Sequence, residues 1–421
     1  MRVIISTIVC LIVAAPFAAV ADGNPIAFVN GTIYPVSSAP IVGGTIVVTK
    51  GKITAIGKDI KIPQNAQVVE CKGKWITPGL IDSVTQLGLT EVSLIRSTVD
   101  GAPARPDPVR ASVRAADGID PRSAAIGVAR RHGVTSVVSS PSGGLIAGQG
   151  AWMDLLDGRD QTWTESVVDD RGVWATFGES GAGAVEKSRA SAMQRLREVF
   201  DDARLYRQNR TQYQRNGLRD LVTSRLDLEA ILKVIDGKQK FLVSVHRASD
   251  ILAVLKFAKK QKIKLVLVGA AEAWLVADQI AEAKVPVILD PTANLPARFD
   301  RRNSRSDNIV LLAKAGVQVV VATQSTHNVS SLRFMLGNAV RSGLSWELAL
   351  RSATLNPAQV FGQNADYGRL EKGRTANLVV WTGDPFEPGS WADSVLIRGN
   401  IQATDNRQTR LRDKYKNRLK L

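Results

Sequence analysis

The sequence contains very little cysteine and histidine, two residue types on which many folds and active sites depend. There are 2 cysteines and 3 histidines among 421 residues. Cys10 lies in an apolar run near the N-terminus, so removal of that run after export would leave Cys71 alone. No disulfide within the chain would then be possible, and packing must hold the fold together. Cys71 falls in a predicted strand, and we interpret it as a core residue.

Several common functional motifs are also absent. The glycine-rich segment 142–150 lacks the Gly-Lys-Ser/Thr of a phosphate-binding loop, and we interpret it as a mobile loop at the mouth of the fold predicted below. No serine lies in a nucleophile-elbow sequence. The basic residues are not interleaved with aromatic ones and match no nucleic-acid motif, so we expect no nucleic-acid partner. After the N-terminal run, no segment has the length and apolarity of a transmembrane helix.

The N-terminus has the composition of a secretory signal peptide. Arg2 is its basic start, Val3–Val13 its apolar stretch, and Ala19-Val20-Ala21 a cleavage site of the small-x-small type. We therefore expect a periplasmic or secreted protein. The formal net charge of +16 favours anionic neighbours, which for an exported protein are envelope phosphates, acidic glycans or lipid headgroups. We interpret the basic segments 186–220 and 407–420 as solvated helix faces with local ion pairs. The alternative is that they bind an anionic envelope surface.

The predicted strands and helices divide the chain into two kinds of structure. Short strands with glycine-containing turns fill residues 25–77 and 368–403, and apolar strands alternate with helices between them. The fold class is therefore predicted as α/β, a (β/α)8 TIM-type barrel with a composite β-sandwich built from both chain ends, and the site at the C-terminal ends of the barrel strands. The clearest barrel strands are predicted at Val134–Ser139, Phe241–Val245, Lys264–Val268, Pro286–Leu289 and Val317–Ala322. The predicted domain boundaries are 1–21 for the signal peptide, 22–77 and 365–405 for the two parts of the sandwich, 78–364 for the barrel, and 406–421 for a basic C-terminal tail.

The start of the predicted barrel carries a motif in which two residues are replaced by others. Pro78-Gly79-Leu80-Ile81-Asp82 is followed by Ser83-Val84-Thr85-Gln86. This stretch resembles the amidohydrolase superfamily signature Pro-Gly-apolar-apolar-Asp-x-His-x-His, with Val84 and Gln86 in place of the two histidines. Further segments similar to the family, in the same order, are 51–57, 133–137, 353–358 and 368–380. The resemblance covers nearly the whole mature chain and is closest to imidazolonepropionase-like and prolidase-like members.

The resemblance implies hydrolysis of carbon–nitrogen bonds other than ordinary peptide bonds, by water activated on a metal ion. The ligand positions of the family fall in this chain on Val84, Gln86, Ser244, Val268 and Gln324. Valine has no ligating atom, and an amide cannot accept the proton that the family's aspartate takes at position 324. No lysine occurs between Lys74 and Lys187, where the bridging carboxylated lysine of some members would lie. We predict that the metal centre is lost and that no cofactor is bound.

The same strand ends are still expected to form a pocket for a small-molecule ligand. The catalytic candidates are Asp82, His246 and His327, and the candidates for substrate contacts are Gln86, Arg247 and Gln324. His246 lies two residues beyond Ser244 and faces the same side of its strand, so the register leaves it open as a replacement ligand. Arg247 suits a ligand carboxylate or phosphate, and His327 can act as acid or base without metal. A structural role is the alternative for each histidine, and for Asp82 it is the capping of the strand end.

Three functional hypotheses follow from these residues. The first is a non-catalytic binding or scaffold protein in the cell envelope, which binds a ligand without turnover. The second is a hydrolase with a metal-independent site around His246, His327 and Asp82. The third is an envelope-surface protein that acts through its basic segments.

Overall fold

The computed structural model describes residues 24–419 except 104–106, 158–166, 404 and 406. The predicted signal peptide lies outside the described residues. The strands are β1 Ile26–Ile33, β2 Ile41–Thr49, β3 Lys52–Gly57, β4 Gln67–Glu70, β5 Trp75–Pro78, β6 Leu80–Thr85, β7 Val134–Ser139, β8 Ile146–Gln149, β9 Ala151–Asp154, β10 Val167–Val168, β11 Val173–Thr176, β12 Phe241–Val245, β13 Leu265–Gly269, β14 Val287–Leu289, β15 Val319–Val321, β16 Leu378–Trp381, β17 Ala392–Ile397 and β18 Asn400–Ile401. The α-helices are α1 Ala124–Arg131, α2 Glu179–Ala184, α3 Arg189–Gln208, α4 Arg210–Gln214, α5 Arg225–Ile235, α6 Ala248–Gln261, α7 Ala277–Glu282, α8 Asn308–Lys314, α9 Leu332–Arg341, α10 Trp346–Ser352, α11 Leu355–Val360 and α12 Arg407–Leu419.

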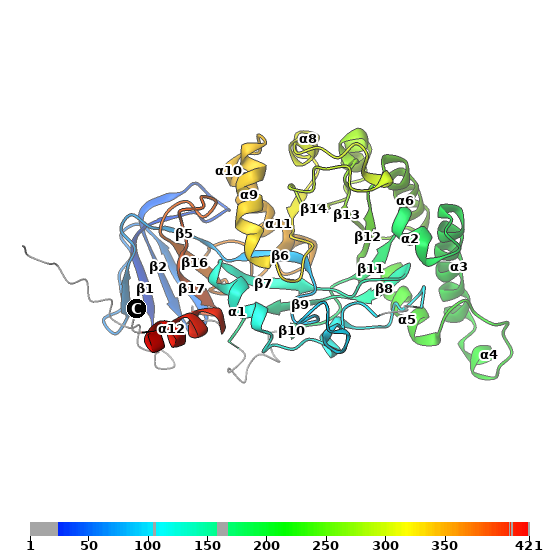
Figure 1. Cartoon of the computed structure of the whole chain (residues 1–421), viewed down its shortest axis with the longest axis horizontal. Helices are drawn as coiled ribbons and strands as arrows, with labels where there is room; N and C mark the ends of the chain where they lie inside the picture. Colours follow the sequence, from blue (N-terminus) through cyan, green and yellow to red (C-terminus); the bar gives the residue numbers. More distant parts are fainter. Residues whose placement is uncertain (1–23, 104–106, 158–166, 404, 406, 420–421) are drawn as a thin grey trace, which may run out of the picture.

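Both ends of the chain contribute to one eight-stranded sheet. Its order is β18-β17-β16-β5-β1-β2-β3, and β4 pairs with β1. The join between the two ends is the antiparallel pair of β5 and β16, in which Trp75 lies opposite Trp381. Figure 1 shows the N-terminal strands in blue beside the C-terminal strands in red-brown. Apolar side chains from both ends share one buried cluster, which includes Phe28, Ile76 and Leu378 and also the buried Cys71, as predicted for a composite β-structure.

The strands of the predicted barrel form two sheets and do not close, so the prediction of a (β/α)8 TIM-type barrel is confirmed only in part, as a mixed α/β fold. One sheet has the order β10-β9-β7-β6 and the other β15-β14-β13-β12-β11-β8. Among the described residues no backbone ladder joins β6 to β15. The backbone N–H of Thr323 instead donates to the carboxylate of Asp82, and the N–H of Ile81 donates to Ala353. Backbone donors at this edge therefore bond to other groups, and the two sheets meet through side chains.

The glycine-rich segment 142–150 is not the mobile mouth loop that we predicted. It contains the buried strand β8, which runs antiparallel to β11, and the next strand, β9, runs antiparallel to β7. A Cβ on Gly148 would lie 2.5 Å from the carbonyl oxygen of Val113, and one on Gly150 would lie 2.3 Å from the ring of Trp174. These glycines permit close packing, which is a second use of glycine besides flexibility. β8 and β9 therefore depart from the all-parallel pairing expected of a (β/α)8 barrel.

The parallel strands have one face toward an inner apolar cluster and one face under the helices. Val266, Val268, Ile288 and Val320 belong to an inner cluster, whereas Leu267 and its equivalents pack with the helices outside. Side chains alternate between the two faces because a strand has a period of two residues. This alternation fixes which side chains reach the interior at the strand ends, where the site is expected.

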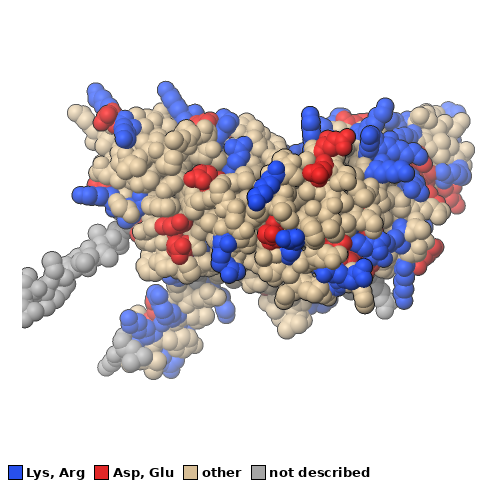
Figure 2. All heavy atoms as spheres, turned by 90° about the horizontal axis from the view of Figure 1, so that it is seen from above, with Lys and Arg blue, Asp and Glu red and all other residues tan. Residues whose placement is uncertain are grey.

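The basic segment 186–220 consists largely of α3 and α4 at one end of the molecule (Figure 1). Arg204 pairs with Asp201, Arg207 with Asp236, and Arg219 with the buried Asp202. Figure 2 shows basic and acidic side chains intermixed at that end. The segment is a solvated helical surface with local ion pairs, as predicted. No helix in the described ranges is both long enough and apolar enough to cross a membrane.

Candidate functional site

The side chains at the positions where the sequence resemblance places metal ligands do not fit a divalent metal ion. Val268 lies in the inner apolar cluster, and Val84 packs against it. The amide of Gln86 points elsewhere, because its Nε2 donates to the Gly101 carbonyl (3.1 Å) and to the Ser142 hydroxyl (2.8 Å). Ser244 is half-buried, and Gln324 is exposed with a φ of 50°. Within the described ranges, no group of three or more His, Cys, Asp or Glu side chains is placed to hold a metal.

Asp82 lies at the join between β6 and the residues that follow β15. Its carboxylate is fully buried and accepts hydrogen bonds from the hydroxyl and the backbone N–H (3.1 Å) of Thr323. Burial raises the pKa of Asp82 to about 7, because the loss of hydration outweighs the hydrogen bonds that favour the charged form. The repulsion from Asp290 acts in the same direction as burial. Asp82 is therefore a carboxyl group that titrates near neutral pH.

His246 follows β12 directly and meets an arginine from a distant loop. Arg301 Nη2 lies 2.8 Å from His246 Nε2. A guanidinium only donates hydrogen bonds, so Nε2 is the acceptor and the proton of the neutral ring is assigned to Nδ1. That Nδ1 is buried and has no hydrogen-bond partner in the described part of the chain. Burial, together with the charges of Arg301 and Arg298, lowers the pKa of His246 to about 3, so the ring is neutral and weakly basic at pH 7.

Gly269, the last residue of β13, makes room for this histidine. Its φ is +82°, and a Cβ built there would lie 2.2 Å from His246 Cε1. The imidazole therefore rests directly on the backbone of Gly269. Only glycine combines this φ with so close an approach.

His246 and Arg301 line a cavity of about 260 Å³ at the C-terminal ends of four parallel strands. Arg301 makes no ion pair among the described residues, and its Nε is buried without a partner. Arg305, also in the lining, differs because it pairs with Asp307 and stacks on Trp274 at 4.6 Å. The Asp290 carboxylate accepts from the Thr292 hydroxyl at 2.6 Å and from the Thr292 N–H at 2.7 Å. The full lining is His246, Gly269, Ala271, Leu289, Asp290, Pro291, Ala293, Arg301, Arg305, Asn308, Thr323 and Gln324.

Of the residues predicted for the site, only His246 and Gln324 line this cavity. Arg247 points to Asp250, with Nη2 2.9 Å from Oδ1, and that carboxylate also binds Arg189. His327 is exposed, and its Nε2 lies 3.0 Å from the Glu91 carbonyl oxygen. Asp82 lies behind Thr323, which is itself part of the lining. The predicted constellation of His246, His327 and Asp82 is therefore not joined by any hydrogen bond among its three members.

Arg301 and Asp290 were missed by the sequence analysis. Both belong to the segment between β14 and α8, which carries Arg298, Arg301, Arg302 and Arg305 within eight residues. A run of arginines in the loop that follows a predicted barrel strand is the signal that points to this segment.

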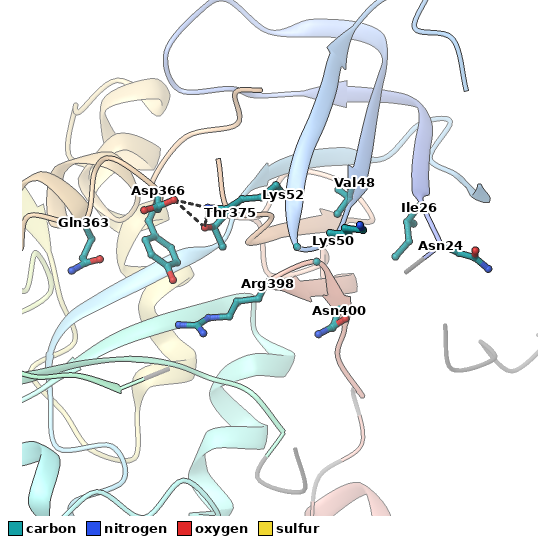
Figure 3. Close-up of a pocket in the computed structure, with 13 residues that line it drawn as sticks. Asn24, Ile26, Val48, Lys50, Lys52, Gln363, Asp366, Thr375, Arg398 and Asn400 are labelled. Atoms are coloured by element: carbon teal, nitrogen blue, oxygen red, sulfur yellow. Dashed lines mark hydrogen bonds and ion pairs between the residues drawn. The ribbon is translucent and has the colours of Figure 1, made fainter. Parts of the chain in front are cut away.

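A larger cavity, of about 590 Å³, lies against the composite sheet and not at the strand ends (Figure 3). Two of its cations have acidic partners: Lys52 lies 2.6 Å from Asp366, and Arg398 lies 2.8 Å from Asp154. The close-up shows Lys52 directed toward Asp366 and Thr375. Size alone would favour this cavity as the functional site. The smaller cavity, however, is lined by residues with buried N–H donors that bond to no described protein group. We take the smaller cavity as the candidate site, because buried polar groups without partners are uncommon in proteins.

Comparison with known proteins gives one consistent family. The family model described as "Amidohydrolase family" matches residues 223–406. An imidazolonepropionase of Acidiphilium cryptum is 24% identical over 378 residues, which is 82% of this chain and 88% of that protein. The amidohydrolase tasK of Hapsidospora irregularis is 21% identical over 86% of this chain, which spans only 40% of that longer protein. The crystal structure of an amidohydrolase from Thermotoga maritima is 29% identical, with a TM-score of 0.81 over 89% of this chain and 99% of that one.

Proposed function

The chain belongs to the amidohydrolase superfamily, and from that premise we propose that it binds a small carboxylate-bearing molecule in the cavity beside His246, without a metal ion and without turnover. The observation that carries the proposal is a pair of buried N–H donors, the Nε of Arg301 and the Nδ1 of His246, which have no acceptor in the described protein and belong to two residues that line this cavity.

A carboxylate satisfies both donors. It can accept from the guanidinium of Arg301 and from an imidazole N–H, and a half-buried arginine without an acidic partner gains most from an anion. Asp290 lies in the same lining and can accept from an N–H group elsewhere on the ligand. The curated relatives include imidazolonepropionases, whose name denotes a nitrogen heterocycle that carries a propionate. The ligand that we propose is therefore a small nitrogen-containing carboxylic acid.

The chemistry of the site favours binding over hydrolysis. A metal-free hydrolase needs a base whose pKa is near the working pH, and a pKa of about 3 makes His246 a very weak proton acceptor. Asp82 has a pKa of about 7, but it is fully buried behind Thr323 and does not line the cavity, and neither does His327. Two of the former ligand positions are valines, so a metal-activated water has no support from them. We retain export through residues 1–21 as part of the proposal, and N-terminal sequencing of the protein secreted by its native host tests it.

Calorimetric titration with 3-(imidazol-4-yl)propionate and with its neutral carboxamide tests the binding proposal. We expect the acid to bind and the amide to bind at least tenfold more weakly. Arg301→Gln should weaken binding of the acid about 10- to 100-fold, the value of one charged hydrogen bond. Arg302→Gln is the matched control, because Arg302 is an exposed arginine on the same loop that does not line the cavity.

Equal affinity of the acid and the amide, or equal effects of the two arginine substitutions, would refute a carboxylate site at Arg301. Elemental analysis after growth in medium with zinc, manganese and iron tests the metal-free part. About one equivalent of tightly held metal per chain would overturn it. Hydrolysis of the carboxamide probe in the presence of a chelator would instead favour a metal-independent hydrolase.

A further inference from the structure

The last described helix, α12, lies against the rest of the fold at its N-terminal end, where Arg407 and Arg410 line a cavity with residues of α1. It spans Arg407–Leu419, and none of its residues is buried. Figure 1 shows it beside the lower end of the composite sheet, and in Figure 2 it projects from the body as a separate element rich in Lys and Arg. Most surface helices bury one apolar stripe against their own protein, and α12 does not. Its sequence pattern therefore serves something other than the packing of this chain.

The side chains of α12 are segregated around its axis. Leu411, Tyr415 and Leu419 follow one another at intervals of four residues, so they form a continuous stripe on one face. Leu411 is half-buried, whereas Tyr415 is 51% exposed and Leu419 is 65% exposed. At about 100° per residue, basic residues flank the stripe on both sides, and the acidic residue Asp413 lies on the opposite face. The flanking residues are Arg407, Lys414 and Arg418 on one side and Arg412 and Lys416 on the other.

We propose that α12 binds the surface of an anionic phospholipid bilayer, with its axis in the membrane plane and the Leu411–Tyr415–Leu419 stripe directed into the bilayer. The inference is independent of the carboxylate pocket. An apolar stripe between two rows of cations is the arrangement by which helices lie at a lipid interface, because the aliphatic and aromatic groups enter the headgroup boundary while the cations meet the phosphates.

The charges of α12 suit phosphate groups outside the protein. The helix carries six basic residues, Arg407, Arg410, Arg412, Lys414, Lys416 and Arg418, against the single acid Asp413. Arg410 pairs with Asp405 and Arg412 with Asp413, whereas Lys414, Lys416 and Arg418 have no acidic partner in the part of the chain that the structure describes. The net charge of the whole chain, +16, adds a long-range attraction toward the same surface.

Co-sedimentation of the full chain with vesicles tests the proposal. The probes are vesicles of phosphatidylcholine alone and vesicles with about one-third phosphatidylglycerol, at physiological salt. We expect binding to the anionic vesicles only. Lys416→Gln with Arg412→Gln should weaken it by roughly fivefold per cation. The triple change of Leu411, Tyr415 and Leu419 to Ser should abolish it. Neither variant should alter the thermal unfolding of the fold, because α12 buries no side chain.

A matched control removes the same charge from another basic surface: Arg197→Gln with Arg215→Gln, two exposed residues of the 186–220 segment. Weakening by this control equal to that of Lys416→Gln with Arg412→Gln would overturn the proposal in favour of diffuse charge. Unchanged vesicle binding by the Ser variant would also overturn the proposal, because charge alone would then account for the binding and the apolar stripe would play no part. Sedimentation velocity that shows a dimer in the wild type and a monomer in the Ser variant would assign the stripe to a second copy of the chain instead.

Discussion

Asp82 should make the stability of this protein depend on pH in a direction unusual for an aspartate. Its pKa is about 7 in the folded protein, against an ordinary value of 3.8. The folded state therefore binds the proton more tightly than the unfolded state does. The stability that Asp82 contributes is fully present below about pH 4 and is lost as the pH rises toward 7. At 1.36 kcal/mol per pKa unit, the interval from pH 5 to pH 7 corresponds to a loss of about 2 kcal/mol, because Asp82 is still half protonated in the folded state at pH 7.

His246 works in the opposite direction over part of the same range. Its folded pKa of about 3 lies below the ordinary 6.5, so the unfolded state binds the proton more tightly and stability rises with pH up to about 6.5. Between pH 5 and pH 6.5 this gain is about 2 kcal/mol. The two groups nearly cancel in the wild type, so the wild-type protein alone should show only a small change.

The substitution Asp82→Asn separates the two effects, because it keeps the shape of the side chain and removes the titration. Urea unfolding, followed by tryptophan fluorescence, gives the free energy of unfolding of both proteins at pH 5 and pH 8. We expect the variant to become more stable relative to the wild type by about 3 kcal/mol between pH 5 and pH 8. The same difference between the two proteins at both pH values would refute the reasoning, because the buried carboxyl would then titrate no differently in the folded and unfolded states.

Two further substitutions test the framework around the site. Asp154→Asn should lower the free energy of unfolding by about 3–5 kcal/mol, because this buried carboxylate pairs with Arg398 and also accepts a hydrogen bond from Tyr367. Asp366→Asn, in the half-exposed pair with Lys52, should lower it by less than about 1 kcal/mol. Equal urea midpoints for the two variants would contradict this ranking. Gly269→Ala should cost about 2 kcal/mol or more and weaken binding of the propionate probe, because the new Cβ meets the His246 ring. Gly373→Ala is its control, since Gly373 has a similar φ of +88° and open space around it, and a loss as large as that of Gly269→Ala would attribute the effect to backbone strain alone.

The local elements of the fold were predictable where apolar runs end at clear breakers. The strands Val134–Ser139 and Phe241–Val245 were predicted with the bounds that the structure shows, and Lys264–Val268 lies one residue early. The two hydrogen bonds from Thr323 to Asp82 at the join between the sheets were not predictable, because the two residues lie 241 residues apart. The reversed strand β8 was also missed, since the glycines that let it pack against Val113 and Trp174 are indistinguishable in sequence from the glycines of a mobile loop.

The candidate site was predictable only in part, and for a physical reason. His246 and Gln324 follow parallel strands, so the strand pattern alone brings them to one edge. Arg301 reaches the same place from a loop 55 residues beyond His246, and no local pattern determines how such a loop folds back. His327 and Arg247 are residue types that suit such a site, but their side chains bond elsewhere. His327 contacts the backbone carbonyl of Glu91, and Arg247 donates to the carboxylate of Asp250.

The pairing of β5 with β16 has a consequence for the folding of this protein during its synthesis on the ribosome. β5 is complete at Pro78, but its partner strand begins only at Leu378, some 300 residues later. For most of translation the N-terminal half of the sheet therefore presents an open strand edge, and the cluster around Phe28 and Ile76 lacks the side chains of Leu378 and Leu396. Open edges with exposed apolar residues invite pairing with other chains. We expect nascent chains that stop before β16 to need a chaperone, and the sheet to become independent of one only after the C-terminal strands have emerged.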